Sequence, residues 1–103
     1  MSFEHLVKGT EEYEKGDVEK AIVELELAVE ANPEDSTAWF VLGCSYAVSK
    51  NYIEAIAAYE KSITLEPEAH AYAALGKSLI EAEQFNAATE CNRKAHQMRP
   101  DIF

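Results

Sequence analysis

Apolar positions recur along the chain at helical spacing. Between residues 36 and 49 an apolar side chain returns every three or four positions, and five other segments show the same spacing. Such spacing places the apolar side chains on one face of a helix. The pattern predicts six helices, near residues 2–15, 18–31, 36–49, 52–65, 69–82 and 85–98. Because only two to four residues link successive helices, neighbours are expected to be antiparallel.

Residues that cap helices stand at several predicted boundaries. Ser2 precedes the first helix and Asp17 the second, and each has an oxygen that can accept a bond from a free backbone N–H. Residues 34–36, Glu-Asp-Ser, can do the same for the third helix. Gly16 predicts a tight turn between the first two helices.

A repeat of about 34 residues runs through the chain. Pro33 and Pro67 lie 34 residues apart, Pro100 follows after another 33, and each comes at the end of a predicted helix, where proline disfavours further helix. Gly43 and Ala55 are small, which indicates that two helices cross closely there. Corresponding positions are held in the second unit by Trp39, Leu42, Gly43, Tyr46, Ala55, Tyr59 and Ser62, in the third by Tyr72, Leu75, Gly76, Leu79, Ala88, Asn92 and Ala95, and in the first by His5, Lys8, Gly9, Glu12, Ala21, Leu25 and Ala28.

The second unit, W-F-V-L-G-C-S-Y followed by A-I-A-A-Y-E-K-S-I-T-L-E-P, resembles the tetratricopeptide repeat. The resemblance covers about residues 2–100 as three repeats. The first repeat departs from the pattern at His5, Lys8 and Glu12, and the third departs at Asn92 and follows a loop that is one residue short. The resemblance implies an all-α fold, a right-handed superhelical array (α-solenoid) of three helix-turn-helix repeats with six antiparallel helices. It implies a single domain over residues 1–103, with repeats near 2–35, 36–69 and 70–103.

The segment 37–50, T-A-W-F-V-L-G-C-S-Y-A-V-S-K, carries two apolar stripes where a surface helix needs one. The first stripe contains Trp39 and packs the repeat. The second stripe is not required by that packing, so its cover is expected to be the protein's own core, a second copy of the chain or a ligand. Its members are Phe40, Cys44 and Ala47, with Val41 and Val48 beside them.

The resemblance implies that this second stripe belongs to a concave groove lined by the first helix of each repeat. The groove would be mostly apolar, with Thr10 and Lys77 among its few polar points. Phe40 and Tyr13 are expected to be the main anchors for a partner. The implied partner-binding residues are Leu6, Thr10, Tyr13, Thr37, Phe40, Val41, Cys44, Ala47, Val48, His70, Ala73, Lys77 and Ile80; Phe3 begins the same stripe, and Ala74 flanks it as Val41 and Val48 do.

Co-chaperone members of the family clamp a C-terminal carboxylate with lysine, asparagine and arginine side chains. The resemblance places those clamp positions at Leu6, Thr10, Val41, His70 and Ala74, so none of the clamp side chains is present. A buried carboxylate would be left without a cation, at a cost of several kcal/mol. We therefore expect no binding of an EEVD-type peptide.

The net charge of −10, from 19 acidic and 9 basic side chains, narrows the kinds of partner that the protein is expected to bind. It argues against nucleic acid and anionic membranes, which both require lysine and arginine. Residues 1–35 hold eleven of the acids and only three lysines, whereas residues 70–103 hold four acids and four bases. A partner with a basic flank is expected to meet the acidic first repeat.

Residues that could carry catalysis or bind a metal are dispersed. His5, His70 and His96 fall in three different predicted helices, and none has a second ligand three or four positions away. Cys44 and Cys91 lie 47 residues apart without a CxxC motif, which favours free thiols. A reactive Cys44 would need a cationic neighbour, for which Lys77 is the nearest candidate. We expect no catalytic residue, no metal and no cofactor.

The sequence has neither the basic start and apolar run of a signal peptide nor the roughly 20 apolar residues that span a bilayer. A cytoplasmic protein is therefore expected. Polar residues on the last helix, Asn92, Arg93 and His96, favour a self-capping end to the array, so we expect the chain to end naturally there; drift at a tolerant position is the alternative for Asn92.

The resulting hypothesis is a non-enzymatic protein–protein interaction module or adaptor. It would bind a peptide or helix of another protein in the apolar groove, without a small-molecule substrate. The alternative is a self-assembling structural scaffold, in which copies of the chain meet through their grooves or end faces. Ile102 and Phe103 would then be a plausible insert into a neighbouring groove.

Overall fold

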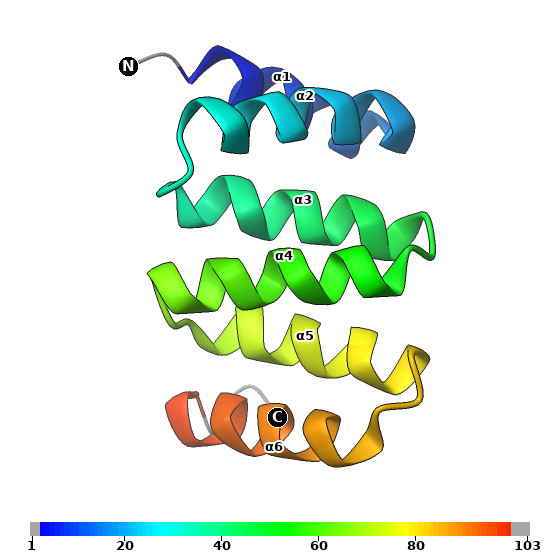
Figure 1. Cartoon of the computed structure of the whole chain (residues 1–103), viewed down its shortest axis with the longest axis vertical. Helices are drawn as coiled ribbons and strands as arrows, with labels where there is room; N and C mark the ends of the chain where they lie inside the picture. The colour runs from blue at the N-terminus through cyan, green and yellow to red at the C-terminus, as the bar shows by residue number, and fades with distance from the viewer. Residues whose placement is uncertain (1–2, 100–103) are drawn as a thin grey trace.

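The computed structural model describes residues 3–99 and contains six helices in chain order. They stack along the longest axis of the molecule, which measures 35 × 26 × 21 Å, and neighbours run in opposite directions (Figure 1). Their bounds lie within two residues of the predicted ones. The helices are α1 (Glu4–Lys15), α2 (Val18–Ala31), α3 (Ser36–Val48), α4 (Tyr52–Leu65), α5 (Ala69–Glu81) and α6 (Phe85–Met98).

Two of the predicted caps are confirmed. The carboxylate of Asp17 accepts a bond from the backbone N–H of Lys20 at 3.4 Å, and that of Asp35 accepts one from Ala38 at 3.2 Å. Gly16 ends α1 with a left-handed φ of 89°, as the predicted turn requires. The proposed cap Ser2 lies outside the described residues.

Each helix pair is held by contact between a glycine and a bulky side chain. A Cβ added to Gly43 would lie 2.7 Å from two ring atoms of Tyr59, and one added to Gly9 would lie 2.6 Å from Leu25. Gly76 has the same relation to Asn92. A small residue at each crossing therefore lets the two helices approach closely, most strictly at Gly43, where the Tyr59 ring is buried.

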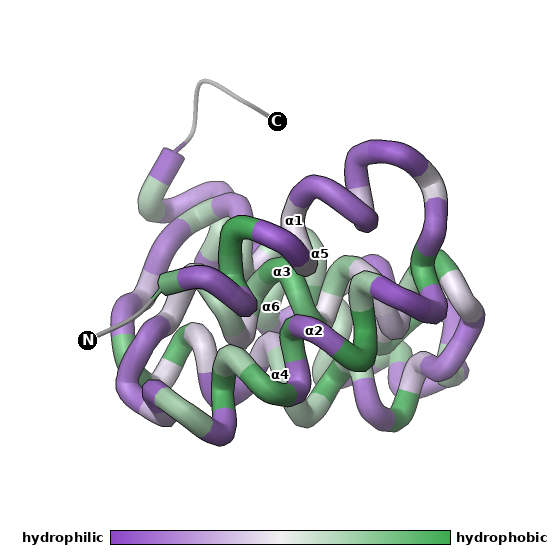
Figure 2. The backbone as a smooth tube through the Cα atoms, turned by 90° about the horizontal axis from the view of Figure 1, so that it is seen from above, coloured by the Kyte–Doolittle hydropathy of each residue, from purple (hydrophilic) through white to green (hydrophobic). Residues whose placement is uncertain are grey.

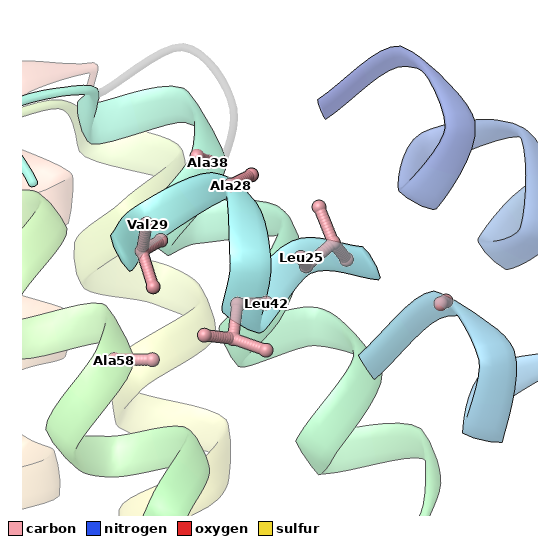
Figure 3. Packing of buried hydrophobic residues seen from close by; sticks show 7 residues of the cluster. Leu25, Ala28, Val29, Ala38, Leu42 and Ala58 are labelled. Carbon is pink, nitrogen blue, oxygen red and sulfur yellow. The ribbon is translucent and has the colours of Figure 1, made fainter. Parts of the chain in front are cut away.

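The buried residues form two clusters. In the first, Leu25, Ala28 and Val29 of α2 pack against Ala38 and Leu42 of α3 (Figure 3). The second joins α4 to α5 and α6 through residues such as Tyr59, Leu75 and Ala88. Seen along the stack, hydrophobic and hydrophilic segments alternate along much of the backbone (Figure 2), as expected for helices that pack on one face and meet solvent on the other.

The aromatic residues of α3 also reach the preceding repeat. The indole N–H of Trp39 donates to the carbonyl of Pro33 at 2.8 Å, and the hydroxyl of Tyr46 donates to a carboxylate oxygen of Glu26 at 2.5 Å. Burial and the Glu26 carboxylate both raise the pKa of Tyr46. These bonds fix the first two repeats relative to one another.

The end faces of the array carry more polar side chains than its internal junctions, although Val7 of α1 is exposed. Where α3 buries Ala38, Leu42 and Ser45 against α2, the same positions of α1 hold Glu4, Lys8 and Glu11, all exposed. Where α4 presents Ile56, Tyr59 and Ile63 to α5, α6 presents Thr89, Asn92 and His96. Stacking another helix on either face would bury charged or polar side chains.

Candidate functional site

The contacts between helices define the concave side of the array. Among residues 3–99, α1 contacts α3 and α3 contacts α5, whereas α2, α4 and α6 do not contact one another. The inner helices α1, α3 and α5 are therefore closer together than the outer helices, and the array curves with the inner helices on its concave face. All thirteen predicted partner-binding residues belong to these three helices.

The middle of this concave face is partly occupied by the protein's own packing. The Phe40 ring lies 5.6 Å from the Tyr59 ring and meets His70 edge-on at 4.8 Å, measured between ring centroids. Phe40, Cys44 and Ala47 pack against the second buried cluster, and Val41 packs against the first. Of the covers considered for the second stripe, the protein's own core therefore accounts for part of the surface of these four residues, because the neighbouring repeats pack against each.

The exposed apolar surface of the concave face lies near the C-terminal ends of the inner helices. Val48 is 57% exposed and Ile80 is 44% exposed. In the first repeat, Leu6, Thr10 and Tyr13 are half-buried. The remaining predicted residues are Thr37, His70 and Lys77, which are exposed, and Ala73, which is half-buried.

The thiols are held in their neutral form. Burial raises the pKa of Cys44, and burial together with the neighbouring thiol raises that of Tyr59. The pKa of Cys91 is also raised, mainly by burial. Because the thiolate is the reactive form, the raised pKa makes both cysteines poor nucleophiles, although Lys94 acts to lower the pKa of Cys91.

The histidines have local partners. Nδ1 of His5 lies 2.7 Å from a carboxylate oxygen of Glu24, and Nε2 of His70 lies 3.1 Å from one of Glu68. Lys8 also approaches Glu24, at 3.7 Å. Within the described residues, no group of three or more histidine, cysteine or acidic side chains could hold a metal ion, and no helix is long and apolar enough to cross a membrane.

Two related depressions beside the outer helices were not predicted. One, of about 360 Å³, has Trp39, Leu42 and Tyr46 of α3 and several residues of α4 in its walls. The other, of about 450 Å³, lies in the first repeat and is lined by charged residues such as Lys8, Glu12 and Glu24. One feature of the sequence could have indicated the charged depression. The first repeat has Lys8 and Glu12 at the positions that Leu42 and Tyr46 hold in the second.

Helix pairs stacked in register, with inner helices forming a concave face, define a helical repeat array. The chain belongs to the tetratricopeptide repeat family, because models of this repeat match residues 5–35 and 36–69. The described helices continue the same pattern into a third repeat, and the predicted all-α array is confirmed.

Two curated relatives match part of the chain. Superkiller protein 3 of Schizosaccharomyces pombe is 33% identical over 68 residues, which is 66% of this chain and 5% of that protein. Cellulose synthase operon protein C of Escherichia coli (strain K12) is 38% identical over 66 residues, which is 64% of this chain and 6% of that protein. The chain therefore corresponds to a small part of these relatives.

Solved structures share the fold. The first tetratricopeptide repeat domain of Spaghetti, bound to the HSP90 peptide SRMEEVD, has a TM-score of 0.93 at 19% identity, over 100% of this chain and 85% of that one. MamA of Desulfovibrio magneticus RS-1 has a TM-score of 0.88 at 24% identity, over 95% and 56%. An O-GlcNAc transferase of Thermobaculum terrenum has a TM-score of 0.86 at 25% identity but is covered over only 19% of its length, so this fold also occurs as part of an enzyme.

Proposed function

We propose that the protein is a non-enzymatic adaptor that binds a segment of another protein on its concave face. The observation that carries the proposal is the exposed apolar surface around Val48 and Ile80, on the face where repeat arrays bind partners. The half-buried residues Phe40 and Tyr13 extend it toward the centre and the first repeat. The neutral thiols and the dispersed histidines favour binding over catalysis.

A pull-down from the native source tests this proposal with a matched pair of variants. Val48→Glu places a charge on the concave face, and Val23→Glu places the same charge on outer helix α2 at an equal exposure of 57%. Specific partners should be lost with Val48→Glu and retained with Val23→Glu. Equal retention by both variants would contradict a concave binding site. Phe40→Glu is a poorer probe, because Phe40 supports internal packing.

The segment bound is expected to differ from that of a chaperone clamp. Leu6, Val41 and Ala74 cannot pair with a carboxylate, and His70 is engaged by Glu68. The similarity to a domain bound to an HSP90 peptide, at 19% identity, is therefore a similarity of fold, and we do not expect this chain to bind the same peptide. Calorimetric titration with SRMEEVD at micromolar concentration should show no saturable heat; a fitted single-site curve would refute this expectation.

The alternative, self-assembly through end faces, is disfavoured by two features. Stacking two copies through α1 would cover Val7 but would also desolvate Glu4, Lys8 and Glu11. Each copy also carries a net charge of −10, so copies repel one another at low ionic strength. The proposed insert, Ile102 and Phe103, lies outside the described residues.

A further inference from the structure

The depression of the second repeat lies in the gap between two outer helices. Helix α3 contacts both α2 and α4, whereas α2 and α4 do not contact one another within the described residues. The depression, of about 360 Å³, therefore opens on the convex side of the array, and α3 forms its floor. Trp39 and Tyr46 at this floor are half-buried, and Ala57 of α4 beside them is exposed. A side chain of another protein can enter here and contact mostly apolar surface.

Two carboxylates stand at the Tyr46 end of the depression without a cation. The hydroxyl of Tyr46 donates to Glu26 of α2 at 2.5 Å, and Glu54 of α4 lines the depression. Burial, the bond to Glu26 and the charges of both carboxylates raise the pKa of Tyr46, so Glu54 also lies close to its hydroxyl. Among residues 3–99, neither carboxylate has a lysine, arginine or histidine within ion-pair distance. A basic group placed between them would be favoured.

The other charges around the depression do not cancel these two. Lys61 of α4 lines the opposite end, because the hydroxyl of the neighbouring Ser62 donates to the backbone carbonyl of the first residue of α3. Two helical turns, about 10 Å, separate Lys61 from Glu54 along α4. Glu30 adds an exposed carboxylate one turn after Glu26, on the same face of α2. The surroundings thus carry three acidic groups and one basic group, and the basic group lies at the far end.

The corresponding gap of the third repeat is partly covered by the chain itself. The ammonium group of Lys94 on α6 lies 5.8 Å from the centre of the Tyr72 ring, which holds the position of Trp39. Among the described residues no cation lies over the Trp39 ring in the same way. The third repeat also has Leu79 and Ala87 where the second has its tyrosine and glutamate, so it lacks the acidic end. The second repeat alone combines an uncovered gap with unpaired acids on both sides.

We propose that the depression of the second repeat is a second binding site, which takes an arginine side chain of another protein. The aliphatic part of the arginine covers the apolar floor, and the guanidinium lies between the carboxylates of Glu26 and Glu54. Arginine fits better than lysine, because its planar group has several N–H donors and can bond to two carboxylates at once. The site goes beyond the proposed function, since it lies on the convex side and leaves the concave face free.

A titration followed by NMR with isotope-labelled protein tests the inference. The probe is a blocked tripeptide, Ala-Arg-Ala, at up to about 10 mM. The matched control peptide replaces the arginine with citrulline, which has nearly the same shape and no charge. The arginine peptide should shift signals along a saturating curve, with the largest shifts at Tyr46, Ala57 and the indole of Trp39. The citrulline peptide should shift the same signals little.

Variants at exposed positions identify the groups that hold the arginine. Glu26→Gln and Glu54→Gln should each raise Kd roughly threefold or more, because each removes one of the two carboxylates. Lys61→Gln removes the cation that lines the depression and should lower Kd. Glu81→Gln removes a negative charge from an exposed position on α5 and should change Kd less than about twofold.

Equal shifts with the two peptides, or no saturating shift, would overturn the inference. An effect of Glu81→Gln as large as that of Glu54→Gln would also overturn it, because the arginine would then be attracted only by the overall charge of the chain. Loss of the shifts in Val48→Glu would place the arginine on the concave face and would equally refute the convex site. The proposed function is tested separately by its own pull-down and stands if the convex site is refuted.

Discussion

At the scale of single residues, the three glycine contacts differ in how much room the partner side chain has. Tyr59, over Gly43, is only 3% exposed and is enclosed by neighbouring repeats. Asn92, over Gly76, is exposed and can turn away. The same glycine position is therefore strict in the second repeat and tolerant in the third.

This difference predicts opposite outcomes for two identical substitutions. Gly43→Ala should destabilise the protein by about 1–3 kcal/mol, because the new methyl overlaps the Tyr59 ring. Gly76→Ala should be neutral or stabilising by up to about 1 kcal/mol, since alanine favours helix and Asn92 can move. Urea unfolding monitored by circular dichroism measures both, and an equal loss from the two variants would contradict the packing argument.

The bond between His5 and Glu24 predicts a pH dependence. The hydrogen bond from His5, with help from Lys8, lowers the pKa of Glu24 below its usual range. A carboxyl whose folded pKa is lowered contributes stability above its unfolded pKa, about 4.3, and loses it as pH falls through the folded pKa. Glu24→Gln should therefore lower the urea midpoint at pH 7, and this difference from the wild type should shrink steadily as the pH falls below about 4.3. Glu30→Gln is the exposed control, and a parallel pH profile for both variants would count against the Glu24 assignment.

At the scale of helices and turns, the turn within each repeat contains one residue with a left-handed backbone conformation, and that residue differs between the repeats. Gly16 adopts a left-handed φ of 89°, while Lys50 and Glu83 adopt φ values of 67° and 63°. Side chains with a Cβ are strained by roughly 1 kcal/mol in this region. The turns of the second and third repeats are therefore strained, whereas the turn of the first repeat is not, because it has a glycine.

Lys50→Gly should therefore stabilise the protein by about 0.5 kcal/mol, the strain relieved less the extra entropy of an unfolded glycine. The control is Ser49→Gly at the preceding position, where φ is −83° and glycine should cost about 0.5–1 kcal/mol. Thermal unfolding of the two variants should shift the midpoint in opposite directions. A lower midpoint for Lys50→Gly would show that the lysine side chain stabilises the turn.

At the scale of the whole molecule, the fold could be predicted because its determinants are local and repeated. The glycine, alanine and proline at Gly43, Ala55 and Pro67 recur in all three repeats at intervals of 33 or 34 residues, so one well-preserved repeat indicated the other two. The candidate site was less predictable, because the contacts of Phe40 with Tyr59 and His70 depend on how repeats pack. The ion pairs of His5 and Lys8 with Glu24 were not predicted, because they depend on how α1 packs against α2 and no single residue indicates them.

The polar end faces and the net charge predict the state of the whole molecule in solution. Light scattering at tens of micromolar should give a mass near 11.5 kDa, that of one chain. A salt concentration of about 1 M screens the repulsion between copies. The mass should stay the same at this concentration, because the polar end faces do not form an interface even without that repulsion. A dimer that Ile80→Glu disperses and Ile53→Glu leaves intact would instead favour self-assembly through the concave face.

The contacts between helices differ on the two sides of the stack, so the array should bend more easily in one direction than in others. Among the described residues, inner helices touch one another and outer helices do not, so the outer gaps can widen or narrow with little loss of packing. Bending about the inner helices should therefore be the softest motion of the array. A partner bound to the concave face would change the curvature of the array. Binding could therefore be detected from the distance between labels on α2 and α6, neither of which contacts the partner.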